Sequence, residues 1–293
     1  MFYTEAFIAY VKYEKRYSPL TVKAYEADLL QFMSYADAVF GLTGAAAITH
    51  THVRSWLVAL ADEGAGAGTL NRKISTLRSY FRFLLKQQWL EVSPMDKVIT
   101  PRRQSRLPQF VQEDTAQQML DAVHSETFTG FTQKLVLELL YQAGLRRTEL
   151  ITLKTTQVDL DKRLLKVWGK GGKERMVPFT GPMEALLQAY LAERDKLAPG
   201  HNVLLVLESG KPLYPEFVYR TVKQHLKLAG ATIAQKSPHV LRHSFATHLV
   251  NNGAELNAVK ELLGHSSLAA TQVYTHSSIA ELQEVFRKTH PKA

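Results

Sequence analysis

Residues 98–109, Val-Ile-Thr-Pro-Arg-Arg-Gln-Ser-Arg-Leu-Pro-Gln, interrupt the periodic apolar pattern that runs along the rest of the chain. This stretch holds two prolines and three arginines and has no helical or strand-like repeat, which is typical of an exposed basic linker. A length of 293 residues fits about two domains. We therefore expect one domain over residues 1–97, a linker over 98–109 and a second domain over 110–293.

The first domain is predicted to be entirely helical. Ser18-Pro19 is a helix start signal, because serine caps a helix and proline fits its first position. Small-residue breaks at 41–47 and 64–68 separate the later helices, so residues 1–97 predict four. The fourth, from about Thr69 to Gln87, has an apolar face of helical spacing. That face consists of Leu70, Ile74, Leu77, Tyr80, Phe81 and Leu84.

Basic residues lie around the rest of this fourth helix. Arg72, Lys73 and Arg78 are candidates for contacts with DNA phosphates, although a solvated basic face remains the alternative. The whole chain has a net charge of +9 and a pI near 9.5, with a positive excess in both halves. This balance favours a polyanionic partner, with nucleic acid ahead of a membrane.

Several functional classes are disfavoured by composition. The chain has no cysteine, which excludes disulfides, thiolate metal sites and a cysteine nucleophile. The first residues lack the charged start and apolar core of a signal peptide. No apolar run reaches the roughly 18 residues of a membrane span. We therefore expect a cytoplasmic protein that does not bind a membrane.

The second domain is predicted to be rich in helix with a small antiparallel sheet. Residues 157–179 are strand-like on both sides of a glycine-rich tip at 169–172, which indicates a β-hairpin. The tip is not a Walker loop, because the required glycine-lysine pattern is absent. A short strand is also expected at Val203–Leu207. Helical patterns fill most of the remainder and end in an amphipathic helix at about 278–289.

Four residues between 237 and 274 suit attack by a tyrosine on a phosphodiester: His239, Arg242, His265 and Tyr274. Planar arginine donors hold the charge on the non-bridging oxygens, and cationic surroundings help a phenol with a pKa near 10 to ionise. A metal site is the rival, since histidines recur near helical spacing in residues 239–248. No carboxylate or cysteine accompanies them as a third ligand, so no metal is expected.

Five motifs in order resemble the tyrosine recombinase, or phage integrase, family. They are Gly144-Leu-Arg146-x-x-Glu149-Leu150, Gly169-Lys170-Gly, His239-x-Leu-Arg242-His, Leu263-Gly-His265 and Tyr274. Their order and spacing are similar to those of the bacterial Xer recombinases of the XerC and XerD type. The N-terminal half resembles the family's four-helix, SAM-like core-binding domain, and residues 287–293 resemble the Xer tail.

The resemblance implies a role for each motif residue. Arg146 and Arg242 would clamp the scissile phosphate, and Lys170 would be the general acid for the 5′ oxygen. His239 would assist proton transfer from the nucleophile Tyr274, and His265 would hydrogen-bond a non-bridging oxygen. Glu149 would support the helix junction without reacting. Lys173 and Arg175 are left as DNA contacts, and no cofactor, metal or ATP is implied.

The resemblance also implies partners. These are double-stranded DNA with a specific site, and a homo- or hetero-tetramer with a related recombinase joined through the helix at 278–289. A DNA translocase and a location on the bacterial nucleoid are further implications. The expected reaction resolves chromosome dimers at a dif-like site. The alternatives are an integrase or transposase of a mobile element, type IB topoisomerase-like cleavage, and a DNA-binding protein that has lost catalysis.

Overall fold

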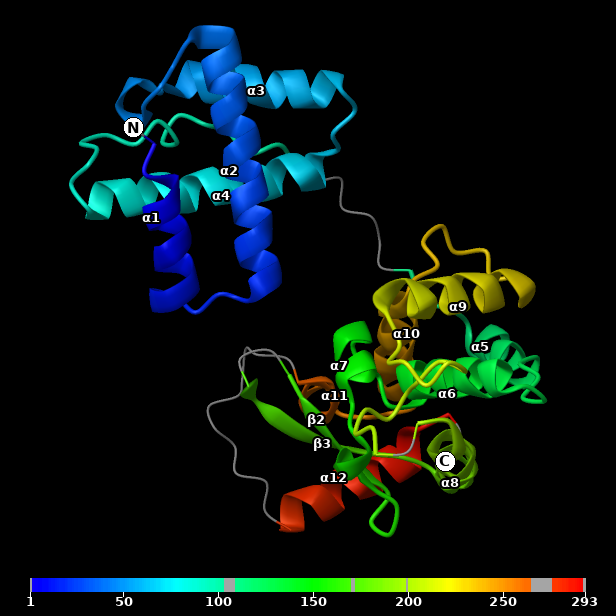
Figure 1. Ribbon diagram of the computed structural model, residues 1–293. Helices are drawn as coiled ribbons and strands as arrows, with labels where there is room; N and C mark the ends of the chain where they lie inside the picture. Colours follow the sequence, from blue (N-terminus) through cyan, green and yellow to red (C-terminus); the bar gives the residue numbers. More distant parts are fainter. Residues whose placement is uncertain (1, 103–108, 170–171, 199, 265–275, 292–293) are drawn as a thin grey trace. The chain divides into compact units, whose positions relative to one another are not determined.

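The computed structural model describes residues 2–102, 109–169, 172–198, 200–264 and 276–291 (Figure 1). Contacts divide the chain into two compact units, Met1–Arg106 and Leu107–Ala293. Residues at the start of the predicted linker belong to the N-terminal unit. Val98 is 4% exposed, and its carbonyl accepts a 3.0 Å hydrogen bond from Arg78 Nη2. Asn71 Nδ2 donates to the carbonyl of Pro101 at 3.0 Å.

The N-terminal unit is helical in its described part, as predicted. Helix α1 (Thr4–Ala9) continues as a π-helical turn, and α2 (Pro19–Phe40), α3 (His50–Asp62) and α4 (Ala67–Lys86) follow. The hydroxyl of Ser18 accepts a hydrogen bond from the backbone N–H of Thr21, so the predicted cap is present. The helices enclose an aromatic core. Its fully buried members include Phe7, Phe32, Trp56, Tyr80 and Phe81.

The C-terminal unit combines helices with a three-stranded antiparallel sheet, which confirms the predicted fold class. Strands β1 (Val158–Asp159), β2 (Leu164–Trp168) and β3 (Glu174–Pro178) pair in that order. Trp168 pairs with Glu174 at the far end of β2, where the backbone N–H of Gly169 donates to the carbonyl of Lys173 at 2.7 Å. The prediction of a strand at Val203–Leu207 is wrong. This stretch makes only isolated β-bridges, from Val203 to Lys154 and from Val206 to Pro212.

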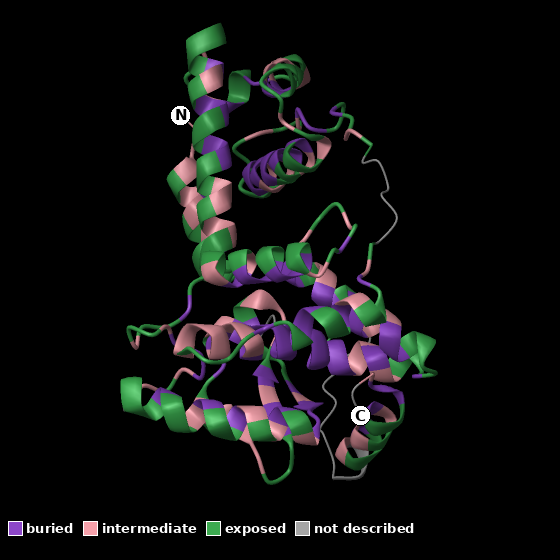
Figure 2. Ribbon diagram, turned by 90° about the vertical axis from the view of Figure 1, so that its right-hand side faces the viewer, coloured by how far each residue is buried: buried purple, intermediate pink, exposed green. Residues whose placement is uncertain are grey.

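The helices of this unit surround α6 (Phe128–Gln142), which packs against α5 (Glu113–Asp121), α7 (Arg147–Thr152), α8 (Gly181–Leu197), α9 (Pro215–Leu228) and α10 (Pro238–Asn251). Residues 135–142 of α6 are buried without interruption, because neighbours cover every side of this helix. On other helices, Figure 2 shows buried residues on one side and exposed residues on the opposite side. In the described part of the chain, no helix is long and apolar enough to cross a membrane.

The C-terminal helix packs on its own unit. Helix α12 (His276–Thr289) lies against α10, α11 (Leu256–Leu263) and β3. Leu282 and Phe286 of α12 are 6% and 3% exposed, in a cluster with Phe245 and Leu249 of α10. Gln283 Nε2 donates to the carbonyl of Lys162 at 2.9 Å. The predicted helix is therefore present, and in this single chain its apolar face is covered by its own unit.

Gly144, between α6 and α7, has a left-handed backbone with φ +56°. A β-carbon there would lie 2.5 Å from Cδ1 of Phe245, whose side chain is 1% exposed and has no space to retreat. Only glycine therefore lets α10 approach the α6–α7 junction this closely.

We predict that Gly144→Ala destabilises the protein more than Gly253→Ala does. Both substitutions place a side chain at positive φ, which costs about 1 kcal/mol. A β-carbon at Gly253 meets nothing within 4 Å, whereas overpacking at Gly144 adds about 1–3 kcal/mol. Urea unfolding followed by circular dichroism measures the difference, and equal losses in the two variants would contradict the packing argument.

Candidate active site

The site begins at the junction between α6 and α7. Arg146 directly precedes α7, and its backbone N–H donates to Glu149 Oε2 at 2.8 Å. The Arg146 guanidinium also donates from Nη1 to Glu149 Oε1 at 2.7 Å. A carboxylate in the first turn of a helix satisfies a free backbone N–H and fits the positive end of the helix dipole. The motif spacing therefore fixes the local position of Arg146.

Glu149 is held from a second direction by Arg175 of β3. Nη1 and Nη2 of Arg175 donate to the two carboxylate oxygens of Glu149 at 2.9 and 2.8 Å. Both side chains are almost completely buried, with exposures of 3% and 4%. Nε of Arg175 donates to the carbonyl of Leu262 at 2.7 Å, so one guanidinium connects β3, α7 and the end of α11.

Arg242 of α10 reaches the same place. It donates from Nη1 to the carbonyl of Gly144 and from Nη2 to the carbonyl of Leu263. Its Nη1 lies 3.8 Å from Glu149 Oε2. Arg146 Nη2 donates to the carbonyl of Gly264 at 3.1 Å, next to the carbonyl that Arg242 binds. Three arginines from three segments therefore converge on one carboxylate and on the C-terminal end of α11.

The electrostatics of this cluster leave an excess of positive charge. Three guanidinium groups surround a single carboxylate. Burial lowers the pKa of Arg242 to about 9, with help from the charges of Arg146 and Arg175 and against the charge of Glu149. Arg242 still carries its proton at neutral pH. A buried cluster of this kind favours an anion as an additional ligand, and planar N–H donors suit the oxygens of a phosphate.

His239 lies one turn before Arg242 on α10, and it is exposed. His243 is exposed as well, whereas His248 is buried and its Nδ1 is 2.8 Å from the hydroxyl of Tyr141. The histidines of α10 thus face different surroundings. Within the described ranges, no group of three or more histidine, cysteine, aspartate or glutamate residues is placed to hold a metal.

Three predicted catalytic residues, Lys170, His265 and Tyr274, lie outside the described residues. Among the described residues, Arg146, Glu149 and Arg242 lie together. His239 is on the same helix as Arg242.

Two of the residues predicted to contact DNA are buried in the structure. Arg175 is engaged with Glu149 and Leu262 inside the unit, so its guanidinium is not on the surface. Lys73 is 7% exposed and donates to Asp28 Oδ1 at 2.9 Å. Both are drawn inward by a buried carboxylate, because an unpaired buried charge is costly. The burial pattern of Arg175 is visible in sequence, since it shares a strand face with Val177.

The remaining DNA candidates are at least partly accessible. Arg72 also pairs with Asp28, but 46% of its side chain is exposed. Arg78 is half-buried, and Lys173 is exposed near the end of the hairpin. These three residues stay candidates for phosphate contacts.

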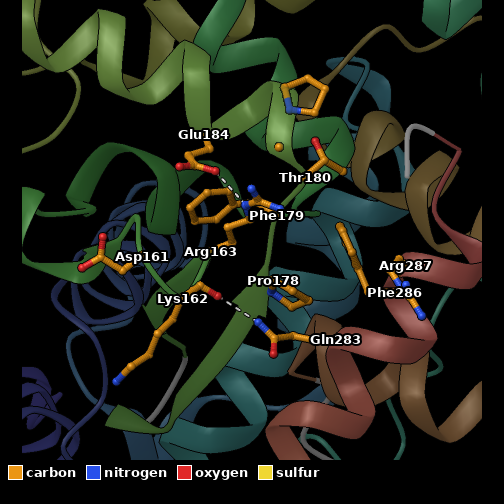
Figure 3. Close-up of a pocket in the computed structure, with 12 residues that line it drawn as sticks. Asp161, Lys162, Arg163, Pro178, Phe179, Thr180, Glu184, Gln283, Phe286 and Arg287 are labelled. Atoms are coloured by element: carbon orange, nitrogen blue, oxygen red, sulfur yellow. Dashed lines mark hydrogen bonds and ion pairs between the residues drawn. The ribbon is translucent and has the colours of Figure 1, made fainter.

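A cavity of about 430 Å³ lies beside α12 (Figure 3). The turn between β1 and β2, the start of α8 and α12 line it, and Arg163 and Glu184 pair across one side at 2.6 Å. None of Arg146, Glu149, Arg175 and Arg242 lines this cavity. The arginine cluster is therefore separate from this cavity.

The state of the Glu149 carboxyl should appear in the pH dependence of stability. Burial raises its pKa, but hydrogen bonds and charge from Arg175, followed by hydrogen bonds from Arg146, outweigh burial and lower the pKa from 4.5 to about 2. A lowered pKa stabilises the folded state above the unfolded pKa, and this contribution is lost as the pH falls through the folded pKa. The shift corresponds to about 3 kcal/mol.

We predict that Glu149→Gln lowers the free energy of unfolding by about 3 kcal/mol at pH 7. The difference from wild type should shrink as the pH falls from about 5 to about 2, where the wild-type carboxyl also becomes neutral. Urea unfolding at a series of pH values measures this. Glu184→Gln, which removes the more exposed pair with Arg163, is the matched control and should cost less than about 1 kcal/mol. A pH-independent difference for Glu149→Gln would contradict the ionised pair.

Both units of the chain match known protein families. Residues 109–281 match the phage integrase family, and residues 4–88 match the N-terminal SAM-like domain of phage integrases. The tyrosine recombinase XerC of Halalkalibacterium halodurans is 38% identical over 99% of this chain and 98% of that protein. XerC of Chlorobaculum parvum is 36% identical over 99% of this chain and 94% of that protein, and XerD of Listeria monocytogenes is 34% identical over 99% and 98%.

Solved structures share the fold. The XerH site-specific recombinase bound to a palindromic difH substrate has a TM-score of 0.72 at 24% identity, over 96% of this chain and 83% of that chain. The Tn1549 transposon integrase in complex with transposon right end DNA has a TM-score of 0.72 at 18% identity, over 97% and 99%. With family matches over both units and relatives above 30% identity along nearly its full length, the chain belongs to the phage integrase family and is a tyrosine recombinase, an enzyme that cuts and rejoins DNA.

Proposed function

We propose that this chain is a site-specific recombinase that resolves chromosome dimers at a dif-like DNA site through a 3′-phosphotyrosyl intermediate. The observation that carries the proposal is the convergence of Arg146, Arg242 and Arg175 on the single carboxylate of Glu149. The cluster has more positive than negative charge, with three guanidinium groups around one carboxylate. Such a site suits a phosphodiester whose transition state spreads charge over its non-bridging oxygens.

The proposed chemistry conserves one phosphodiester bond per step. The phenolate oxygen of Tyr274 attacks the scissile phosphorus while the bond from phosphorus to the 5′ oxygen breaks. Lys170 gives the leaving oxygen its proton, and His239 takes the proton of the phenol. Arg146 and Arg242 hold the non-bridging oxygens, with His265 as a further donor. The phosphotyrosyl bond keeps the energy of the broken bond, so rejoining needs neither ATP nor a metal.

Within this cluster the three arginines divide into two kinds. Arg146 has 30% of its side chain exposed and makes one side-chain bond to Glu149 and one to a carbonyl. Arg242 is more deeply buried and is held by two carbonyls. Arg175 has its guanidinium committed to Glu149 and Leu262. Arg146 and Arg242 are therefore the phosphate ligands in the proposal, and Glu149 is a supporting residue.

Double-stranded DNA with a specific site is the proposed substrate. The net charge of +9 supports a polyanionic partner. The solved XerH and Tn1549 integrase structures are complexes with DNA, and the XerH substrate is named difH. Arg72, Arg78 and Lys173 are the proposed phosphate contacts outside the active site.

The proposed assembly is a homo- or hetero-tetramer with a related recombinase, in which α12 is donated to the next subunit. In this chain Leu282 and Phe286 of α12 are buried, and α10 and α11 of the same unit are the partner surface. In the assembly a neighbour's copy of the α10–α11 surface would supply that partner. A DNA translocase is a further proposed partner.

The likeness in fold to a transposon integrase favours one second candidate, integration of a mobile element. Both candidates use the same cleavage chemistry and differ in the DNA that is joined. Selecting bound duplexes from a random library gives the site, and its position in a genome separates them. A site near the replication terminus supports dimer resolution, and sites at the ends of an element support integration.

The proposed nucleophile can be tested with a duplex that carries the selected site and a nick beside it. Loss of the short fragment traps the covalent intermediate, so wild type should accumulate a protein–DNA adduct. We predict no detectable adduct with Tyr274→Phe and a normal yield with Tyr214→Phe, an exposed tyrosine of the same unit. Denaturing gels quantify the adduct. Adduct formation by Tyr274→Phe would show that another residue attacks, and relaxation of plasmids without the site would favour a topoisomerase.

A further inference from the structure

Arg175 has no role in the chemistry proposed above, yet it is the most completely engaged side chain of the arginine cluster. Its guanidinium donates two hydrogen bonds to Glu149 of α7 and one to the carbonyl of Leu262 in α11. At 3% side-chain exposure it is buried, whereas the flanking residues of the hairpin, Lys173 and Glu174, are exposed. A buried arginine with this geometry fixes the position of the strand that carries it.

The strand in question is one side of the hairpin that leads to Lys170. Arg175 pairs with Val167 in the ladder between β2 and β3, and the pair Trp168–Glu174 and the bond from Gly169 to Lys173 follow toward the tip. The base of the hairpin is therefore attached at Arg175 to the same carboxylate that holds Arg146. Gly169 lies close to that cluster as well. A β-carbon there would be 3.9 Å from both Arg146 Nη1 and Glu149 Oε1.

The end of α11 is shaped around the same side chain. Gly264 has φ +63°, and a β-carbon at this position would lie 3.0 Å from Cδ of Arg175. The carbonyl of Leu263 accepts from Arg242 and that of Gly264 accepts from Arg146. Arg175 thus connects β3 of the hairpin to the end of α11, where the two arginines that are proposed to bind phosphate also donate hydrogen bonds.

Resting on the proposed function, we propose that Arg175 is a positioning residue for proton donation. It holds the base of the β2–β3 hairpin, which leads along the chain to the proposed acid Lys170, at a fixed position relative to Arg146 and Arg242. The two phosphate-binding arginines depend on it less. Arg146 has bonds to Glu149 and Gly264 that do not involve Arg175, and Arg242 likewise has bonds to two carbonyls.

Arg175→Lys is the test variant. Lysine keeps the charge opposite Glu149 but cannot reproduce two parallel bonds to the carboxylate together with a bond to Leu262. We expect the first-order rate of cleavage of the nicked duplex to fall about 100-fold, as a small misplacement of a catalytic group does. The dissociation constant for the intact duplex should be unchanged. Arg163→Lys, in the turn directly before β2 and paired with Glu184 at the surface, is the matched control and should cleave normally.

A second substrate distinguishes positioning of the acid from general damage. In a duplex whose scissile 5′ oxygen is replaced by sulfur, the leaving group departs as a thiolate and needs no proton. On this duplex both Arg175→Lys and Lys170→Ala should cleave at close to the wild-type rate. Arg146→Lys should remain slow, because its loss affects the non-bridging oxygens. Arg175→Gln, which keeps an N–H donor without the charge, should show a deeper loss with oxygen and the same recovery with sulfur.

The outcomes separate the two proposals. Recovery of Lys170→Ala without recovery of the Arg175 variants would overturn the positioning role and leave the recombinase chemistry intact. Normal cleavage of oxygen DNA by both Arg175 variants would overturn it as well. Failure of wild type to form an adduct, or failure of Lys170→Ala to recover with sulfur, would overturn the proposed chemistry and this inference with it.

Discussion

The arrangement of the catalytic unit depends on the buried carboxylate of Glu149. One side chain is bound by Arg175 through both oxygens and by Arg146 through its backbone and guanidinium, with Arg242 at 3.8 Å. The charges of Glu149, Arg175 and Arg242 are not tolerable alone at such low exposure, because removing one partner leaves a desolvated charge without compensation. The mutual requirement brings α7, β3, α10 and the end of α11 to one point.

The same requirement links structure to reaction. Arginines that are already held by carbonyls and a carboxylate need little reorganisation when a phosphate arrives, and preorganised donors are the main source of electrostatic catalysis. Close packing supports them. Gly144 allows Phe245 to approach the α6–α7 junction, which sets the distance between Arg242 on α10 and the carbonyl that it binds. Packing and polar contacts therefore act on the same backbone segment.

The sequence predicts much of the fold because its signals are local. Ser18-Pro19 begins α2, and the glycine-rich tip at 169–172 marks the hairpin, since caps and turns depend on neighbouring residues. The motif around Arg146 and Glu149 likewise places its own salt bridge. Lys73 could not be placed this way, because its partner Asp28 comes from another helix and helical spacing alone does not reveal it. Arg175, a candidate DNA contact from the sequence, is buried against Glu149, and its alternation with Val177 along β3 is the sequence signal for this inward position.

The central claim is that Arg146 and Arg242 bind the scissile phosphate while Arg175 keeps Glu149 in place. The most direct measurement is an experimental structure of the protein trapped covalently on a nicked duplex that carries its selected site. The account predicts a phosphate joined to Tyr274, with Arg146 and Arg242 within hydrogen-bonding distance of its non-bridging oxygens and the Glu149–Arg175 pair intact. A phosphate that is bound by other residues, or an Arg175 that leaves Glu149 to contact DNA, would contradict it.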